Sequence, residues 1–276
     1  MKTNPPSEDD LLAAGFVLER RDLRHSTALM LVDRSKPDYD PLVVDFLSGP
    51  LLHRLKTGLS KAQPMGRALG LKSYRAEEGP LVLDATAGMG TDAFMMSALG
   101  CRVRAIERSP VIFKLLQDGH ERLRSATLPE SRPESRPESE DEAARARAAF
   151  SQPTANAVKT ISEIAKRLSF ENASSHEILR GLAEAGLESC PDIIYLDPMY
   201  PEEGRSKSAL PKKEMQIFRR LLGDDHDTEA LFELALSASR TRVVVKRPLS
   251  APALGGRATH SFEGKTARFD MYLVKR

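Results

Sequence analysis

Two short motifs place an acidic side chain where an apolar run ends. The first is Leu81-Val-Leu-Asp-Ala-Thr-Ala-Gly-Met-Gly90, in which Asp84 precedes a loop of small residues. The second is Ile193-Ile-Tyr-Leu-Asp-Pro-Met-Tyr-Pro201, in which Asp197 precedes a proline-rich turn. Small residues allow a sharp turn and a close approach of the backbone to a ligand, and prolines stiffen a turn. The pair predicts a pocket for a nucleotide-like cofactor beside a pocket for a planar amine.

Details of the first motif favour S-adenosylmethionine (SAM) as the cofactor. Asp84 can face the amino group of a bound methionine moiety. No Lys-Ser or Lys-Thr pair follows Gly88 and Gly90, so the loop is not a P-loop. Glu107 ends the next apolar run, 23 residues after Asp84, where a carboxylate can accept both ribose hydroxyls. The alternatives are a tight turn without a ligand and a dinucleotide oxidoreductase, although the Gly-x-Gly-x-x-Gly form of the latter is not met.

Other residues at the expected strand ends are candidates to line the same pocket: Thr91, Asp92, Arg108, Ser174 and Ser175. Asp92 would also be favoured in the first turn of a helix, because the helix dipole stabilises a negative charge there. The arginine flanks the adenine or is solvated, and the serines are hydroxyl donors near the adenine or caps of a helix.

The second motif supplies what methylation of a base amine requires. Guanine N2 and adenine N6 are poor nucleophiles because their lone pairs are delocalised into the ring, so acceptors for the N–H bonds raise their reactivity. Asp197 supplies a carboxylate and Pro198 a carbonyl, both held by the stiff turn. Tyr200 can stack on the base, which is worth roughly 1–3 kcal/mol. We therefore predict methyl transfer from SAM to a nucleic-acid amine, with a proline-rich turn of no catalytic role as the alternative.

A basic stretch follows the second motif. Between residues 205 and 220, Glu214 alone opposes a set of cations: Arg205, Lys207, Lys212, Lys213, Arg219 and Arg220. Such a stretch can be a solvated helix face. Its position after the proline-rich turn favours contact with RNA phosphates, and we expect the same of Lys246 and Arg247.

Composition limits the class of protein. Of 276 residues, 41% are hydrophobic and 29% charged, which is typical of soluble globular proteins. No stretch approaches the roughly 18 apolar residues of a membrane span, and the N-terminus does not resemble a signal peptide. The two cysteines and six histidines show no spacing typical of a disulfide framework or a metal site. We expect a cytoplasmic monomer that binds neither a metal nor a membrane.

The elements that position these residues alternate from about residue 76 onward. Strands are expected at 81–84, 102–107, 193–197, 242–246 and 269–274, and helices at 91–99, 110–124, 212–222 and 228–239. Such alternation predicts an α/β fold with a doubly wound parallel sheet over residues 76–276.

The remaining parts of the chain have a different pattern. Residues 1–75 are expected to form a small N-terminal α/β module with strands at 16–18, 28–32 and 42–47, and then a basic loop leading to a short helix that ends at Gly70. Residues 126–157 contain a repeated Ser-Arg-Pro-Glu and few apolar residues. We expect a flexible insertion there.

Five segments resemble, in order, motifs of the bacterial ribosomal RNA small-subunit methyltransferase J family: residues 84–94, 100–110, 195–201, 207–215 and 243–248. The resemblance covers about residues 40–276. That family makes N2-methylguanosine in 16S rRNA from SAM. The resemblance therefore implies a class I, Rossmann-like SAM-dependent methyltransferase whose partner is the 16S rRNA of the small ribosomal subunit. It also implies SAM contacts at Thr91, Asp92, Glu107, Arg108, Ser174, Ser175 and Asp197.

Two other functions stay open from the residues. The Asp-Pro-aromatic motif also suits methylation of adenine N6 or cytosine N4 in RNA or DNA. A ribosome-assembly factor would keep the fold without turnover, although the intact carboxylates of Asp84, Glu107 and Asp197 argue against it.

Overall fold

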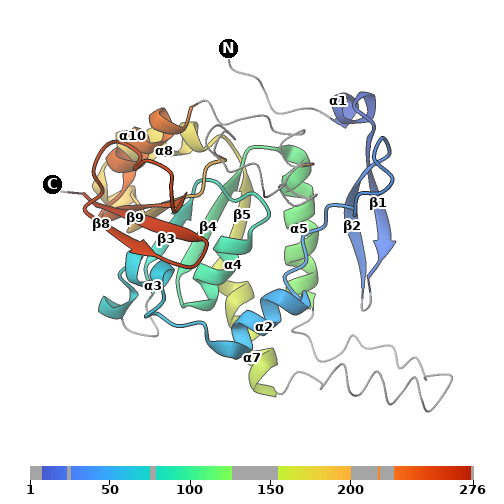
Figure 1. Cartoon of the computed structure of the whole chain (residues 1–276), viewed down its shortest axis with the longest axis horizontal. Coiled ribbons are helices and arrows are strands. Elements are labelled where there is room, and N and C mark those ends of the chain that lie inside the picture. The colour runs from blue at the N-terminus through green and yellow to red at the C-terminus, as the bar shows by residue number, and fades with distance from the viewer. Residues whose placement is uncertain are drawn as a thin grey trace.

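A mostly parallel β-sheet forms the centre of the molecule (Figure 1). The computed structural model of the 276-residue chain describes residues 8–23, 26–74, 79–125, 155–199, 217 and 227–274. The seven-stranded sheet has the order β5-β4-β3-β6-β7-β9-β8, in which the first five strands are parallel and β9 is antiparallel to both neighbours. The strands are β3 (Leu81–Asp84), β4 (Arg102–Glu107), β5 (Leu168–Asn172), β6 (Ile193–Leu196), β7 (Arg242–Pro248), β8 (His260–Glu263) and β9 (Ala267–Leu273).

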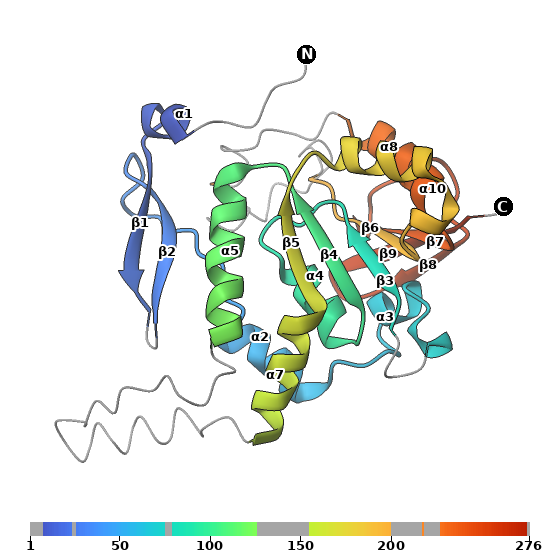
Figure 2. The same cartoon turned by 180° about the vertical axis from the view of Figure 1, so that it is seen from behind.

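Helices cover both faces of this sheet, which confirms the predicted doubly wound α/β fold (Figure 2). One face carries α4 (Thr91–Ala98), α5 (Pro110–Ser125) and α7 (Ala155–Arg167), and the other carries α8 (Ser175–Ala185) and α10 (Thr228–Ala238). Successive strand residues point to opposite faces. In β3, for example, Val82 joins the core under α4 and α5, whereas Leu83 joins the core under α8 and α10.

The N-terminal segment packs beside α5 (Figures 1 and 2). It consists of α1 (Glu8–Ala13) and an antiparallel hairpin of β1 (Phe16–Asp22) and β2 (Thr27–Asp33). The carboxylate of Asp118 on α5 accepts hydrogen bonds from Leu29 N at 3.1 Å and from Arg20 Nη1 at 3.0 Å. Buried residues of the segment, among them Phe16 and Leu31, share one hydrophobic core with α4 and α5.

The prediction of a β-strand at residues 42–47 is wrong. The segment is extended, but it pairs only through an isolated bridge between Leu31 and Leu42. Leu42, Val44 and Phe46 are buried in alternation as a strand would require, and the Val44 carbonyl accepts a hydrogen bond from the Arg122 side chain instead of from a neighbouring strand. The alternating pattern therefore reports burial against α5 and not strand pairing.

Several other elements complete or extend the sequence prediction. Helix α2 (Gly49–Gly58), which we did not predict, overlaps the start of the basic loop expected from His53. The expected short helix is α3 (Pro64–Ala68), followed by Gly70 at φ 69° and a 3₁₀ turn at Leu71–Ser73. Strand β8 was also not predicted. The helix expected at 212–222 lies outside the described residues apart from Ile217, and so does residue range 126–154 of the expected insertion. The part at 155–157 belongs to α7.

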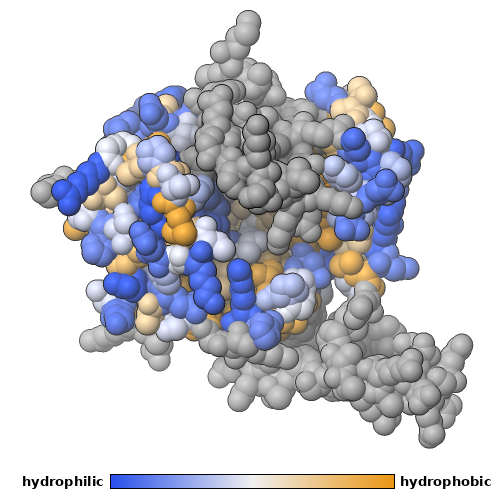
Figure 3. Space-filling view, in the orientation of Figure 1, coloured by the Kyte–Doolittle hydropathy of each residue, from blue (hydrophilic) through white to orange (hydrophobic). Residues whose placement is uncertain are grey.

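The described surface is polar and has no extended apolar face in this view (Figure 3). Apolar residues appear on it in small separate groups. The large apolar side chains that are exposed among the described residues are Leu12, Leu187, Leu249 and Leu273. Within the same residues, no helix combines the length and apolar character that crossing a bilayer requires.

Candidate active site

The acidic residues of both sequence motifs meet at one edge of the sheet. Asp84 ends β3, Glu107 ends β4, and Asp197 follows β6. Strand β3 lies between β4 and β6 in parallel register, so the carboxyl ends of all three strands lie side by side. In open α/β sheets, ligands bind in the crevice at this edge.

The glycine loop between β3 and α4 is held tightly against its surroundings. Gly88 has φ 53° and Gly90 has φ 72°, a left-handed conformation that favours glycine. A Cβ added at Gly90 would lie 2.8 Å from Leu116 Cδ2 and 3.0 Å from Phe46 Cζ. Gly90 is therefore required both by the turn and by close packing.

The Glu107 carboxylate braces this loop. Its Oε2 accepts a hydrogen bond from Gly88 N at 3.0 Å, and its Oε1 accepts one from Ser109 N at 2.7 Å. A carboxylate oxygen can accept more than one hydrogen bond. The sequence predicted a ligand contact for Glu107 and did not predict its role in ordering the loop.

Asp84 is buried, with 1% of its surface exposed. Its Oδ1 accepts a hydrogen bond from Thr86 N at 3.0 Å. Burial raises the pKa of the Asp84 carboxyl to about 8; the Thr86 bond opposes this rise, and the neighbouring Asp92 adds to it. Asp84 is therefore mostly protonated near neutral pH in the protein without ligand.

Three further residues, Asp92, Lys246 and Tyr195, join Asp197 in what we call the carboxylate–lysine cluster. Lys246 Nζ donates to Oδ2 of Asp92 and to Oδ2 of Asp197, each at 2.8 Å. Tyr195 Oη donates to the same Asp92 oxygen at 2.7 Å. The cluster joins α4, the end of β6 and β7 around two carboxylates.

The Asp197 carboxylate is the most exposed acid of the cluster, at 37% of its side chain. Loss of hydration raises its pKa to about 6, Lys246 lowers it, and Asp92 raises it. The backbone of Asp197 is fixed as well, because its N–H donates to Thr86 Oγ1 at 2.6 Å. Thr86 thus links the loops that carry Asp84 and Asp197, and sequence reasoning did not single it out.

The remaining cofactor candidates surround the same strand ends. Thr91 begins α4 directly after Gly90, and Arg108, half-buried, follows Glu107. Ser174 precedes α8 at its N-cap position without a side-chain capping bond, so its hydroxyl does not cap the helix in this structure. Ser175 is buried and donates to the Ala85 carbonyl at 2.7 Å, which ties α8 to the glycine loop.

Strand β7 carries the two basic residues Lys246 and Arg247, which we expected to face RNA. Adjacent strand residues point to opposite faces, and Lys246 points towards α4 and the carboxylates. Arg247 therefore points the other way, is only 5% exposed, and donates to the Pro252 carbonyl. Pro198 is buried beside Asp197. The other candidates on the amine side lie outside the described residues: Tyr200, Lys207, Lys212 and Lys213.

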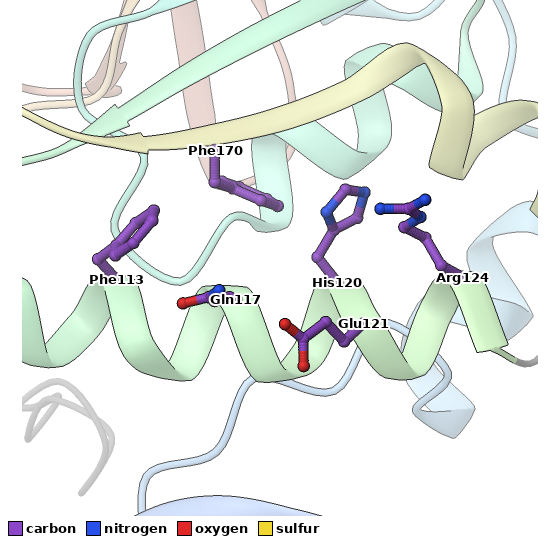
Figure 4. A pocket seen from close by; sticks show the side chains of 6 residues that line it. All are labelled: Phe113, Gln117, His120, Glu121, Arg124 and Phe170. Atoms are coloured by element: carbon purple, nitrogen blue, oxygen red, sulfur yellow. The ribbon is translucent and has the colours of Figure 1, made fainter.

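A separate hollow lies between α5 and β5 (Figure 4). Its volume is about 200 Å³, and it is lined by Phe113, Gln117, His120, Glu121, Arg124 and Phe170. His120 meets the edge of the Phe170 ring, and its Nε2 lies 3.2 Å from the Ala165 carbonyl oxygen. Burial lowers the pKa of His120. None of the predicted site residues lines this hollow.

The arrangement at the strand ends fits a cationic nucleotide-like cofactor. The carboxylates of Asp92 and Asp197 complement positive charge, and the mostly neutral Asp84 carboxyl can accept a hydrogen bond from an ammonium group. Among the described residues, no group of three or more His, Cys, Asp or Glu side chains is arranged to hold a metal ion.

Comparison with known proteins gives the family. A family described as "Putative SAM-dependent methyltransferase" matches residues 17–132 and 151–274. A "Ribosomal RNA small subunit methyltransferase J" from Thioalkalivibrio sulfidiphilus is 40% identical over 91% of this chain and 82% of its own. The protein of the same name from Aliivibrio fischeri is 38% identical over 98% of this chain and 94% of its own.

A solved structure has the same fold. The SAM-dependent methyltransferase from Neisseria gonorrhoeae superposes with a TM-score of 0.57 and 27% identity, covering 90% of this chain and 79% of that one. These matches confirm the predicted class I fold and SAM as the cofactor. The chain belongs to the ribosomal RNA small subunit methyltransferase J family of SAM-dependent methyltransferases.

Proposed function

We propose that the protein methylates the exocyclic N2 amine of a specific guanosine in the 16S rRNA of the small ribosomal subunit. The observation that carries this proposal is the position of Asp197, an acceptor preceding Pro198 at the end of β6, beside the glycine loop and the acids of the cofactor side. Relatives named for small-subunit rRNA methylation support the substrate.

We infer that the cofactor side holds SAM through groups already in place. Asp84 faces the methionine amino group, and Glu107 accepts the ribose hydroxyls while it keeps the Gly88 amide in position. The other contacts line the adenine and methionine moieties: Thr91, Asp92, Arg108, Ser174 and Ser175. When bound, SAM supplies an electrophilic methyl group.

The amine side prepares the nucleophile. The Asp197 carboxylate and the Pro198 carbonyl accept hydrogen bonds from the target N–H groups, which lets the nitrogen pyramidalise with its lone pair towards the methyl group. Tyr200 stacks on the base. Placement of the reacting atoms in line supplies much of the acceleration, because proximity contributes roughly 7–11 kcal/mol. The proton of the methylated nitrogen leaves late, to Asp197 or to water.

The RNA surface of the proposal is the basic stretch at 205–220, with Lys207, Lys212 and Lys213 contacting phosphates. We leave out Arg247, because it is buried, and Lys246, because it contacts Asp92 and Asp197. We further propose that the protein acts as a monomer in the cytoplasm and that its reaction needs no metal.

The deciding experiment is transfer of a tritiated methyl group from SAM to small subunits that lack this protein's modification. Digestion of the rRNA to nucleosides should give labelled N2-methylguanosine. Label in N6-methyladenosine or N4-methylcytidine would show that the target is another base, although the same mechanism would apply. No label with naked 16S rRNA or with assembled subunits would favour the assembly-factor alternative.

A further inference from the structure

Lys246 bridges the carboxylate that faces the target amine and a carboxylate of the cofactor side. Its ammonium lies 2.8 Å from Oδ2 of Asp197 and 2.8 Å from Oδ2 of Asp92. The lysine side chain is mostly buried, with 28% exposed, so it is held within the site and not on an open surface. A cation placed this way contacts both acids at once.

Two neighbouring carboxylates oppose each other's ionisation, and a positive charge beside them reduces this opposition. Without a cation, such a pair tends to retain one proton, and its titration belongs to the pair and not to either residue. Asp92 does raise the pKa of Asp197, and Lys246 opposes that rise. In turn, both acids raise the pKa of Lys246 above its ordinary value, so the lysine stays charged. The positive charge of Lys246 thus balances the two carboxylates as a shared proton otherwise would.

The other groups around the pair do not replace the lysine. From β6, the hydroxyl of Tyr195 donates to Asp92 at 2.7 Å, and burial raises its pKa so that it stays neutral. From β3, the buried Asp84 has a pKa of about 8 and is mostly neutral near pH 7. Among the described residues, Lys246 is therefore the cation that is hydrogen-bonded to Asp197.

We propose that Lys246 is a positioning residue, which holds the Asp197 carboxylate beside Asp92 in the ionised form and orients it to accept a hydrogen bond from the target amine. The inference rests on the proposed function, because it gives Asp197 its task. A hydrogen bond to an ionised acceptor is roughly twice as strong as one between neutral groups. Its strength grows as the nitrogen gains positive charge, so the bond stabilises the transition state more than the bound substrate.

Replacing the ammonium changes the protonation of the pair more than its total charge. In Lys246→Met, the two carboxylates take up one proton in place of the lysine charge. Attraction for a cationic cofactor should therefore change little, and SAM affinity should be nearly retained. The rate of methyl transfer should fall, because Asp197 becomes a weaker acceptor.

The test compares Lys246→Met with Lys246→Arg, the variant that keeps the charge, in single-turnover methylation on saturating small subunits across the pH range. Near pH 7, Lys246→Met should be about tenfold slower, since each unit by which the pKa of an acceptor lies above the assay pH lowers its ionised fraction about tenfold. The difference in rate from the unchanged protein should shrink as the pH rises, so that the acid limb of the rate profile lies at higher pH in the variant. Lys246→Arg should keep its limb near that of the unchanged protein.

Loss of rate by the same factor at every pH, or a strong loss of SAM affinity by calorimetry, would assign Lys246 a merely structural role and overturn the proposal. If Lys246→Met does not fold, Asp92→Asn serves as the test. Removing the second acid should move the acid limb of the rate profile to lower pH. An unmoved limb in that variant contradicts the proposal.

A measurement without turnover separates this inference from the proposed function. Carbon-13 NMR titration of the aspartate carboxyls should show one carboxyl of the cluster titrating at higher pH in Lys246→Met than in the unchanged protein. An identical titration curve overturns the inference even if the enzyme is active. Absence of methyl transfer by the unchanged protein, with the titration shifted, overturns the proposed function alone.

Discussion

The two sides of the site hold their acids in different ways. On the cofactor side, Asp84 and Glu107 are buried, and backbone amides of neighbouring loops donate to them. On the amine side, Asp197 shares a lysine with the neighbouring Asp92, and both acids are partly exposed. Backbone amides hold the first two side chains in place through the fold, whereas a shared cation couples the ionisation of the other two acids. The acids of the cofactor side therefore depend mainly on backbone hydrogen bonds, and Asp197 on the amine side depends on the charge of a lysine.

The largest expected effect lies on the amine side. Asp197→Ala removes the acceptor of the target amine and should lower single-turnover methylation by about 10²–10³-fold, the range seen when a transition-state hydrogen bond is lost. The fold should survive, because the backbone N–H of Asp197 keeps its bond to Thr86 Oγ1. Calorimetry with SAM and thermal unfolding provide the controls. A near-normal rate in this variant would reduce Asp197 to a turn residue.

The next effect is the pH dependence of stability that Asp84 causes on the cofactor side. Burial raises the folded-state pKa of Asp84 to about 8 from the 3.8 of the unfolded chain. A raised pKa contributes stability that is fully present below the unfolded value and is lost as the pH rises through the folded value. Asp84→Asn keeps a neutral acceptor for Thr86 N and should remove this loss, on the order of 1 kcal/mol per pH unit within that window.

Urea unfolding at several pH values between about 5 and about 8 measures this difference in slope. The free energy of unfolding of the unchanged protein should fall relative to that of Asp84→Asn as the pH rises. Equal slopes for the two proteins would mean that Asp84 is ionised when buried. The cofactor side would then also depend on charge, and the contrast between the two sides would disappear.

Glu107→Ala tests whether one carboxylate both orders the glycine loop and binds ribose. SAM affinity should fall by roughly 1.5–3 kcal/mol, the worth of hydrogen bonds to a charged group. Stability should fall too, because the amides of Gly88 and Ser109 lose their acceptor. Glu107→Gln is the matched control, since an amide oxygen can still accept one of these bonds. Unchanged SAM affinity in folded Glu107→Ala would remove Glu107 from the pocket.

The sequence predicted the parts of this site that depend on strand ends. Asp84, Glu107 and Asp197 each follow an apolar run, and parallel strands bring such ends to one edge, so their proximity follows from pattern alone. Contacts across the sheet could not be predicted in this way. The hydrogen bond that the Asp197 N–H donates to the Thr86 hydroxyl depends on how two loops meet.

The roles of Lys246 and Arg247 depend on strand register. A basic pair on a strand must point to opposite faces, but the sequence does not say which face holds the acids. The register of β7 places Lys246 on the side of α4 and turns Arg247 towards the Pro252 carbonyl. The same limit explains residues 42–47, where alternating burial arises from packing on α5 without a partner strand.

The smallest expected effect concerns the hydroxyl that joins β6 to the cluster. Tyr195 is fully buried, and its Oη donates to Asp92 Oδ2, which Lys246 also contacts. Tyr195→Phe keeps the ring in the core and leaves Asp92 its lysine, so we expect a loss of about 0.5–1.5 kcal/mol in the free energy of unfolding, as for one ordinary hydrogen bond. The rate of methylation should change little, because the Asp197 carboxylate keeps its contact with Lys246. Urea unfolding and single-turnover methylation measure the two quantities on the same preparation. A rate loss as large as that of Asp197→Ala would show that the hydroxyl, and not the lysine charge, controls Asp92 and Asp197.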